Sequence, residues 1–316
     1  MSEELKSQIV YPDVSEIRKA IYEGDTGVTV DKELDKIIGR IVDFQNPIRA
    51  NVPRIQGTGT GYKCKRRAPG ATPAKWVLDT EEGDEGTGSY TEVEFPYRTI
   101  LARGQVSRKA RKQGQALIDL LVEEIESKAN EFKNTEEAAM ITGNSSDGKT
   151  PDGLKYLIPS SQQILANAGV TPGDLTLDLM DQLLDRVKGI PSALFMSKRS
   201  RRRLNALLQA SQRFLDRTEV KGGFKVLSYN ECPIFASSNI VNTQQVDGTG
   251  VTSETGGSSS SIYCVSFVEF FVKELTSVQI LPLARTSSQF EKFDIFCDEV
   301  FPIRDYLTAA KLVGVA

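Results

Sequence analysis

Residues 57–97 have too few apolar side chains to form a core of their own. The segment contains seven glycines and twelve charged residues, against five large apolar side chains: Trp76, Val77, Leu78, Val93 and Phe95. Alternating patterns at 62–66 and at 93–97 predict two strands joined by polar turns. Because a long hairpin with so little to bury is marginally stable in water, we expect this arm to pack against another molecule. A mobile surface loop is the alternative interpretation.

The charges of this arm are separated along its length. Its first part is basic and its tip is acidic, with Lys63, Lys65, Arg66, Arg67 and Lys75 followed by Asp79, Glu81, Glu82, Asp84 and Glu85. Such polarity suits head-to-tail packing around a ring, in which one surface meets a different surface of the next copy. The arm therefore predicts self-assembly.

Composition favours a soluble protein with a real core. The chain has 316 residues, of which 39% are hydrophobic and 26% charged, as is usual for globular proteins. No apolar run approaches the roughly 18 residues that span a membrane, and the first residues do not resemble a secretory signal. The four cysteines are far apart, as expected for free thiols in a reducing cytoplasm.

Two features argue against other functional classes. A net charge of −3 is unlike that of a dedicated nucleic-acid-binding protein. The chain has no histidine, so the usual general base and the Ser-His and Cys-His pairs are absent. The helical spacing of Asp178, Asp181 and Asp185 is typical of a solvated helix face. The glycines of 57–61 are typical of a flexible hinge. We expect no enzyme activity, catalytic residue, cofactor or metal site.

The first half of the chain reads as an arm, a hairpin and a long helix. Residues 1–45 predict an N-terminal arm with short helices, the clearer one at 31–42. An extended link is predicted at 46–56 and a strand at 98–106. A helical stripe predicts a rod over 113–142, stopped by Gly143 and Asn144.

The second half alternates between helices and strands. A helix is predicted from Leu177 to a stop at Gly189, then a buried strand at 193–196 and a helix capped by Ser197. Short strands are expected at 224–227 and 233–236, and a flexible Gly/Ser/Thr loop at 247–261. Further strands are expected at 262–272, 278–283 and 293–297. The fold class is α+β, with one mixed subdomain inserted into a second.

This order of parts resembles the major capsid proteins of tailed bacteriophages, which have the Hong Kong 97 capsid fold. The likeness rests on ordered motifs along the chain: Ala74-Lys75-Trp76-Val77, Ala102-Arg103-Gly104-Gln105-Val106-Ser107, Ile141-Thr142-Gly143-Asn144, Pro151-Asp152-Gly153-Leu154, Leu175-Thr176-Leu177-Asp178-Leu179, Pro191-Ser192-Ala193-Leu194-Phe195-Met196-Ser197, and a closing strand Val300-Phe301-Pro302-Ile303-Arg304 before an apolar tail.

The resemblance implies a division of the chain. It gives an N-terminal arm (1–45), a link with the extended hairpin or E-loop (46–97), a peripheral domain with its spine helix and β-sheet (98–174), an inserted axial α/β domain (175–269), and a return to the peripheral domain (270–316). It implies an icosahedral shell of pentamers and hexamers in the virion, assembled in host cytoplasm. Packaged double-stranded DNA would lie nearby, with separate scaffold, portal and decoration proteins as further partners and no membrane.

Charged clusters suggest where copies meet. Basic residues gather at 108–112 and at 198–203, and we expect one cluster to receive the acidic hairpin tip of a neighbour. The expected interface residues are Trp76, Glu81, Glu82, Asp84, Glu85, Arg199, Arg201, Arg202 and Arg203. A solvated helix face and a DNA-binding module are alternatives. An encapsulin-like compartment holding cargo enzyme is the alternative that shares the fold.

A covalent crosslink between copies is a further possibility that the resemblance raises. Some family members join a lysine of this loop to an asparagine of a neighbour. Lys63, Lys65 and Lys75 are available here, but nothing in the sequence marks one of them as buried or activated.

Overall fold

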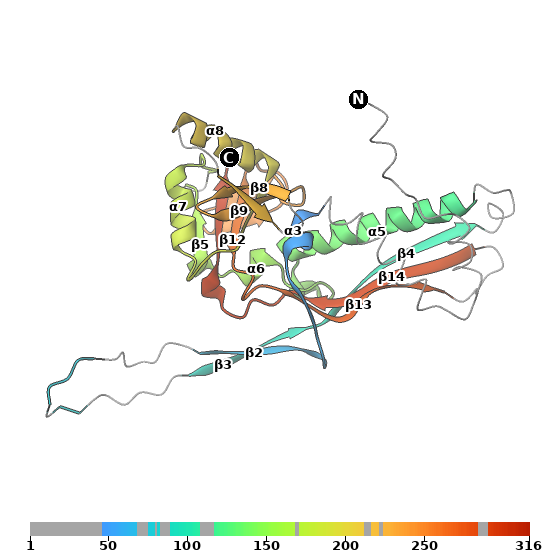
Figure 1. The fold of residues 1–316 in the computed structure, drawn as a ribbon, viewed down its shortest axis with the longest axis horizontal. Coiled ribbons are helices and arrows are strands. Elements are labelled where there is room, and N and C mark those ends of the chain that lie inside the picture. Colours follow the sequence, from blue (N-terminus) through green and yellow to red (C-terminus); the bar gives the residue numbers. More distant parts are fainter. Residues whose placement is uncertain are drawn as a thin grey trace. The chain divides into compact units, whose positions relative to one another are not determined.

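The computed structural model describes residues 46–67, 75–79, 81–82, 89–107, 117–167, 171–211, 216–220, 224–283 and 290–316 (Figure 1). The N-terminal arm predicted at 1–45, and residues 113–116 of the predicted long helix, lie outside these ranges. The chain divides into two compact units. The first includes residues 100–133 and 278–297, and the second residues 46–99, 134–277 and 298–316.

A mixed sheet of seven strands organises the second unit. Its order is β5-β15-β12-β6-β9-β8-β7, with β6 parallel to β9 and antiparallel to β12. The strands are β5 (Gln163–Leu165), β6 (Ala193–Ser197), β7 (Asp216–Val220), β8 (Phe224–Tyr229), β9 (Cys232–Ser237), β12 (Ser260–Val265) and β15 (Ala309–Val315). The strands predicted at 193–196, 224–227 and 233–236 are confirmed.

Alternating side chains give this sheet two buried faces. On β6, Leu194 and Met196 contribute to one core cluster and Phe195 to the other, as the period of two in a strand requires. Helices α7 (Leu177–Asp185) and α8 (Lys198–Ala210) cover the first face. The second face is covered by α3 (Pro47–Asn51), the end of α5 (Leu117–Thr142) and α6 (Leu154–Leu157).

Local caps explain where helices α7 and α8 begin. The Ser197 hydroxyl accepts a hydrogen bond from the Ser200 amide (3.1 Å), so the predicted cap of α8 is confirmed. The Thr176 hydroxyl likewise accepts from the Leu179 amide at the start of α7. The predicted stop of α7 at Gly189 is wrong, since the helix ends at Asp185. The chain leaves the helix there, and the Lys188 amide donates to the Leu307 carbonyl.

The first unit has a smaller core between α5 and long strands. Residues of β4 (Arg98–Ser107), β13 (Val272–Pro282) and β14 (Phe290–Val300) pack with those of α5 through Ile125, Phe132, Ile280, Phe293 and Ile295. The sheet order is β1-β13-β14-β4, where β1 is Arg54–Gln56. The strand predicted at 98–106, those at 278–283 and 293–297, and the stop of α5 at Gly143 are confirmed.

Close packing explains one glycine of this unit. A side chain at Gly104 on β4 would place its Cβ 2.1 Å from the ring of Phe293. Glycine therefore lets this strand approach the aromatic ring. Among the helices within the described ranges, none is both long and apolar enough to cross a membrane.

The sequence predicted an extended link at 46–56, but this segment is only partly extended. It contains the short helix α3, which begins at Pro47, where the fixed φ of proline suits a first helical position. The buried carboxylate of Glu137 accepts hydrogen bonds from the amides of Ile48 (3.1 Å) and Arg49 (3.3 Å). A distant side chain thus satisfies amides that the first turn of a helix leaves free.

Three predictions in the last third of the chain are also corrected. The supposed flexible loop at 247–261 contains a hairpin of β10 (Gln245–Asp247) and β11 (Gly250–Ser253), because Asp247 accepts from the amides of Thr249 and Gly250. The strand predicted at 262–272 breaks after Val265, where turns occupy 267–269. Residues 300–304 do not form the closing strand, which is β15.

Candidate assembly interface

The predicted hairpin is present at its near end. Strands β2 (Gly61–Arg67) and β3 (Tyr90–Pro96) pair antiparallel from Gly61↔Pro96 to Arg67↔Tyr90. Tyr62 and Cys64 lie opposite Phe95 and Val93, so one face of the ribbon collects its apolar side chains. The alternation read from the sequence is therefore confirmed for both strands.

The base of this hairpin packs against its own subunit. The ring of Tyr62 lies 5.8 Å from that of Phe271 in an edge-on arrangement, and 6.4 Å from the stacked ring of Phe95. The ammonium of Lys273 lies 5.4 Å from the centre of the Tyr62 ring, and Phe95 is buried. The composition of 57–97 did not predict this packing within the subunit, because Phe271 and Lys273 belong to a distant part of the sequence.

Arg66 is the second element of the anchorage. Its guanidinium donates to the backbone carbonyls of Arg304 (Nε, 2.8 Å) and Ile303 (Nη2, 2.6 Å). It also lies 6.0 Å from the ring centre of Phe95 and 5.6 Å from that of Tyr306, within the range of cation–π attraction. A residue that contributed to the predicted basic part of the arm therefore fastens the hairpin to the body.

Farther along the arm, apolar side chains face solvent. Trp76 is fully exposed (103%) and Leu78 is 76% exposed. A turn follows, in which the Glu81 amide donates to the Leu78 carbonyl (2.9 Å), and Glu81 and Glu82 are exposed. Asp84 and Glu85 lie outside the described residues. Adjacent exposed apolar side chains of this kind are typical of an interaction site.

The basic part of the arm is partly neutralised within the hairpin. Lys63 Nζ lies 3.2 Å from a carboxylate oxygen of Glu94 and 3.5 Å from one of Glu92. Its hydrogen bond with Glu94 and the charges of both carboxylates raise the pKa of Lys63. Lys65 and Lys75, the other crosslink candidates, are exposed.

The arginines of α8 divide into two kinds. Arg199 Nη2 donates to the carbonyls of Ser258 (2.7 Å) and Val315 (3.3 Å), and Arg203 forms an ion pair with Asp174. Arg202 is exposed and Arg201 half-buried. The structure thus uses Arg199 and Arg203 inside the chain and leaves Arg202 facing solvent. The other basic cluster, at 108–112, lies outside the described residues.

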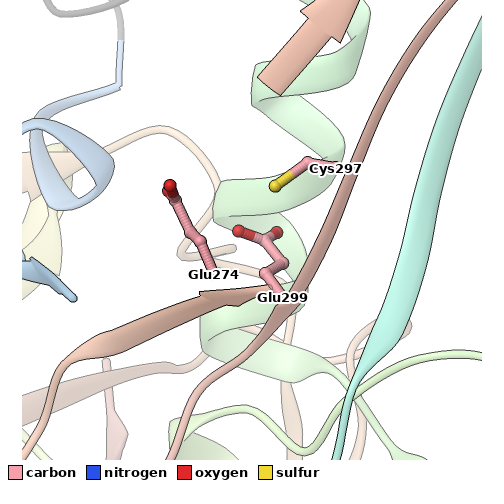
Figure 2. Close-up of side chains that lie close together, drawn as sticks. All are labelled: Glu274, Cys297 and Glu299. Atoms are coloured by element: carbon pink, nitrogen blue, oxygen red, sulfur yellow. The ribbon is translucent and has the colours of Figure 1, made fainter. Parts of the chain in front are cut away.

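A buried ion cluster fixes the link that precedes the hairpin, and sequence reasoning missed it. Glu136, which is fully buried, accepts from Arg49 Nε (2.5 Å) and from Arg54. Arg54 also pairs with Glu274 and lies 3.8 Å from Glu299. Figure 2 shows Glu274 on β13 and Glu299 on β14, with Cys297 two residues before Glu299. No local sequence pattern predicts these arginine–glutamate pairs, because the paired residues are far apart in sequence.

Electrostatics holds this cluster together. Burial alone would raise the pKa of Glu136, but the charges of Arg54 and Arg49 hold it below its ordinary value. Burial and the nearby charge of Glu136 raise the pKa of Glu299 well above its usual range. One carboxylate therefore remains charged against the arginines, while the other favours its protonated form.

Solved structures with a similar fold are capsids and related shells. The holo-SrpI encapsulin complex of Synechococcus elongatus has a TM-score of 0.64 at 12% identity, covering 85% of this chain and 87% of that one. The capsid of the native GTA particle has a TM-score of 0.59 at 13% identity, covering 85% of this chain and 90% of that one. The structure from Gordonia phage Cozz has a TM-score of 0.55 at 13% identity, covering 86% of this chain and 87% of that one. The fold is thus an α+β capsid fold of the Hong Kong 97 type.

The sequence places the chain more narrowly than the fold does. Residues 26–292 match the model of the "Phage capsid family", so the chain belongs to that family. It is a structural capsid protein. A search of curated proteins found no match.

Proposed function

We propose that this chain is a major capsid protein, many copies of which form a closed icosahedral head shell around phage double-stranded DNA. The observation that carries the proposal is the hairpin arm. Its base is fastened by Tyr62 and Arg66, whereas Trp76 is fully exposed. An anchored arm that presents a bare tryptophan suits contact with a neighbouring copy, since interface cores are enriched in aromatic side chains.

The capsid resemblance implies an axial domain and a peripheral domain with different positions in the shell. We assign 175–269, which supplies β6–β9 and β12 with α7 and α8, to an axial domain around five-fold and six-fold axes. The segments 98–174 and 270–316 would form the peripheral domain, apart from their strands β5 and β15, which belong to the same seven-stranded sheet as β6, β9 and β12. Residues 57–97 would form the E-loop. Family membership supports this assignment, as does the mixed α/β character of 175–269.

Within the shell, the acidic arm tip would meet the basic helix α8 of the next copy. The proposed interface is the predicted one, and Arg201 and Arg202 are its main basic members, because Arg199 and Arg203 already bond within their own chain. An exposed ion pair contributes only about 0–1 kcal/mol. A closed shell repeats each pair in every copy, so the summed contribution becomes appreciable.

Charge reversal tests this interface. Replacing Glu81, Glu82, Asp84 and Glu85 with lysine should reduce particle yield and salt tolerance in assembly assays, and replacement with the neutral amides should reduce them less. Reversing Arg201 and Arg202 to glutamate in the lysine variant should restore assembly. Unaltered yield in the reversed variant, or no rescue by the second reversal, would reject the contact.

The encapsulin likeness supports a second candidate function. A compartment that holds cargo protein would share the fold. The structural similarity to an encapsulin supports this candidate. Negative-stain imaging and nuclease treatment of purified particles distinguish the two. Particles that protect DNA support the phage shell, and particles filled with protein support the compartment.

A further inference from the structure

The four most exposed large apolar side chains within the described residues fall into two groups. Trp76 and Leu78 belong to the arm, with exposures of 103% and 76%. Ile190 and Val268 belong to the body, with exposures of 87% and 68%. All four lie in the second compact unit. Surface apolar residues of this size are usually scattered singly, so two such pairs require a common explanation.

Ile190 and Val268 share one end of the β6–β12 strand pair. The Ser192 amide donates to the Val265 carbonyl (2.9 Å), and the Phe267 amide donates to the Ser192 hydroxyl (3.1 Å). These bonds place the loop 188–192 beside the turn 266–269. We call these two segments the end surface.

The end surface continues to the base of the hairpin. The Ser266 amide donates to the Thr308 carbonyl, which ties the turn to the segment 306–308. Arg304 Nη2 donates to the Val268 carbonyl (2.6 Å), and the Arg304 carbonyl accepts from Arg66. The end surface therefore lies where the arm of the same subunit is fastened.

Charge complements the apolar character of the two groups. Asp79 directly follows the apolar residues 76–78 of the arm and is exposed. On the end surface, Lys188 is exposed beside Ile190, and Arg304 is exposed beneath Val268, paired with Glu269 at 2.9 Å. The apolar segment of the arm thus has an acidic neighbour, and the apolar patch of the end surface has the exposed Lys188, while the charge of Arg304 is already paired with Glu269. Charges of opposite sign at these two places would favour one register of contact.

We infer that the arm segment 76–79 of one copy docks on the end surface of a second copy of this chain. The inference rests on the proposed shell function and supplies the receiving site for the apolar part of the arm. Because the end surface adjoins the base of the receiving copy's own arm, each arm tip would lie near the base of the next arm. Such heterologous contacts close into rings when the rotation between copies permits.

Site-directed crosslinking between two copies tests the contact directly. In a Cys64→Ser background, a Leu78→Cys chain is mixed with a Val268→Cys chain, assembled and treated with a short bismaleimide. A covalent dimer is expected only in the mixture. Leu78→Cys mixed with Tyr156→Cys is the matched control, because Tyr156 is exposed on α6 of the same unit. Well-formed particles without the dimer, or an equal dimer yield with the control, overturn the inference.

Fluorescence supplies an independent readout, since Trp76 is the only tryptophan of the chain. Its emission should shift to shorter wavelength on assembly, and this shift should be lost in the Ile190→Ser/Val268→Ser variant and retained in Tyr156→Ser. A retained shift in the double variant counts against the end surface. If the unsubstituted chain forms no particles at all, the shell function fails together with the inference. Particles without the contact contradict the inference alone.

Discussion

Lys311 is a buried lysine on β15 of the seven-stranded sheet. It lies opposite Tyr263 on the neighbouring strand, and its ammonium donates to the Lys155 carbonyl (2.7 Å). Burial, and then the charge of Lys155, lower its pKa from 10.5 to about 8. The folded chain therefore binds this proton more weakly than the unfolded chain does.

The resulting prediction concerns stability at alkaline pH. The unfolded state holds more protons between pH 8 and 10.5, so the free energy of unfolding contributed by Lys311 should rise across that window, by at most about 3 kcal/mol. Lys311→Met should flatten this rise, and Lys149→Met, at an exposed site, should not. Denaturant unfolding at a series of pH values measures the difference. Equal slopes in both variants would contradict it.

The buried ion cluster yields a second prediction at the level of residues. Glu136→Gln should lower the free energy of unfolding by about 3–5 kcal/mol, because it removes the buried carboxylate that Arg49 and Arg54 share. Replacing Arg54 and Glu136 together with methionine should cost less than the sum of the two single changes to methionine, since each single change already loses the ion pair between them. Strict additivity in a double-mutant cycle would show that the cluster is not coupled.

At the scale of elements, the hairpin is a ribbon fastened at one end. Arg66 donates to two carbonyls of the segment 303–304 and contacts two rings, whereas the neighbouring Lys65 is exposed. The fastening therefore depends on alternate residues of β2, those on the face turned to the body.

Arg66→Ala should loosen the hairpin without unfolding the sheet. Loss of the two charge-assisted hydrogen bonds is worth about 1.5–3 kcal/mol each, so amide exchange at 61–67 and 90–96 should accelerate while exchange in β6 and β12 stays slow. Lys65→Ala is the control and should leave both rates unchanged. Slow exchange of β2 in the Arg66 variant would mean that the aromatic contacts alone hold the arm.

Elements whose signals are local could be predicted from the sequence. The buried run before Ser197 and the hydroxyl of Ser197 itself mark a strand and a helix start within a few residues of each other. The hairpin at 245–253 was hidden because glycine, serine and threonine dominate its composition, whereas the single carboxylate of Asp247 closes its turn.

Long-range contacts explain what the sequence could not predict. Tyr62 meets Phe271, and Arg54 meets Glu136 and Glu274, across separations that no periodicity records. For the candidate interface, Trp76, Glu81 and Glu82 are exposed, and their contact with a neighbouring copy stays a prediction. The intrachain bonds of Arg199 and Arg203 depend on the positions of Ser258, Val315 and Asp174, and these follow only from the folded chain.

At the scale of the whole molecule, folding of the subunit and assembly of the shell are separable. Within the described residues, the last pair of the hairpin is Arg67↔Tyr90, so residues 68–89 can be replaced by an Asn-Gly turn that suits a two-residue hairpin. This deletion should leave the unfolding temperature nearly unchanged and abolish closed particles in electron micrographs. A full-length variant with Lys149→Met is the control for particle formation. Normal shells from the shortened chain would contradict an arm-dependent assembly.

The position of β15 has a consequence for synthesis in the cell. This strand is buried along its whole length and lies between β5 and β12, so the sheet keeps an open slot until residue 315 has left the ribosome. A nascent chain still attached to the ribosome before that point cannot present a finished subunit to its neighbours. The sheet is therefore complete only after β15 has inserted, and a chain without this strand would leave unpaired edges on β5 and β12.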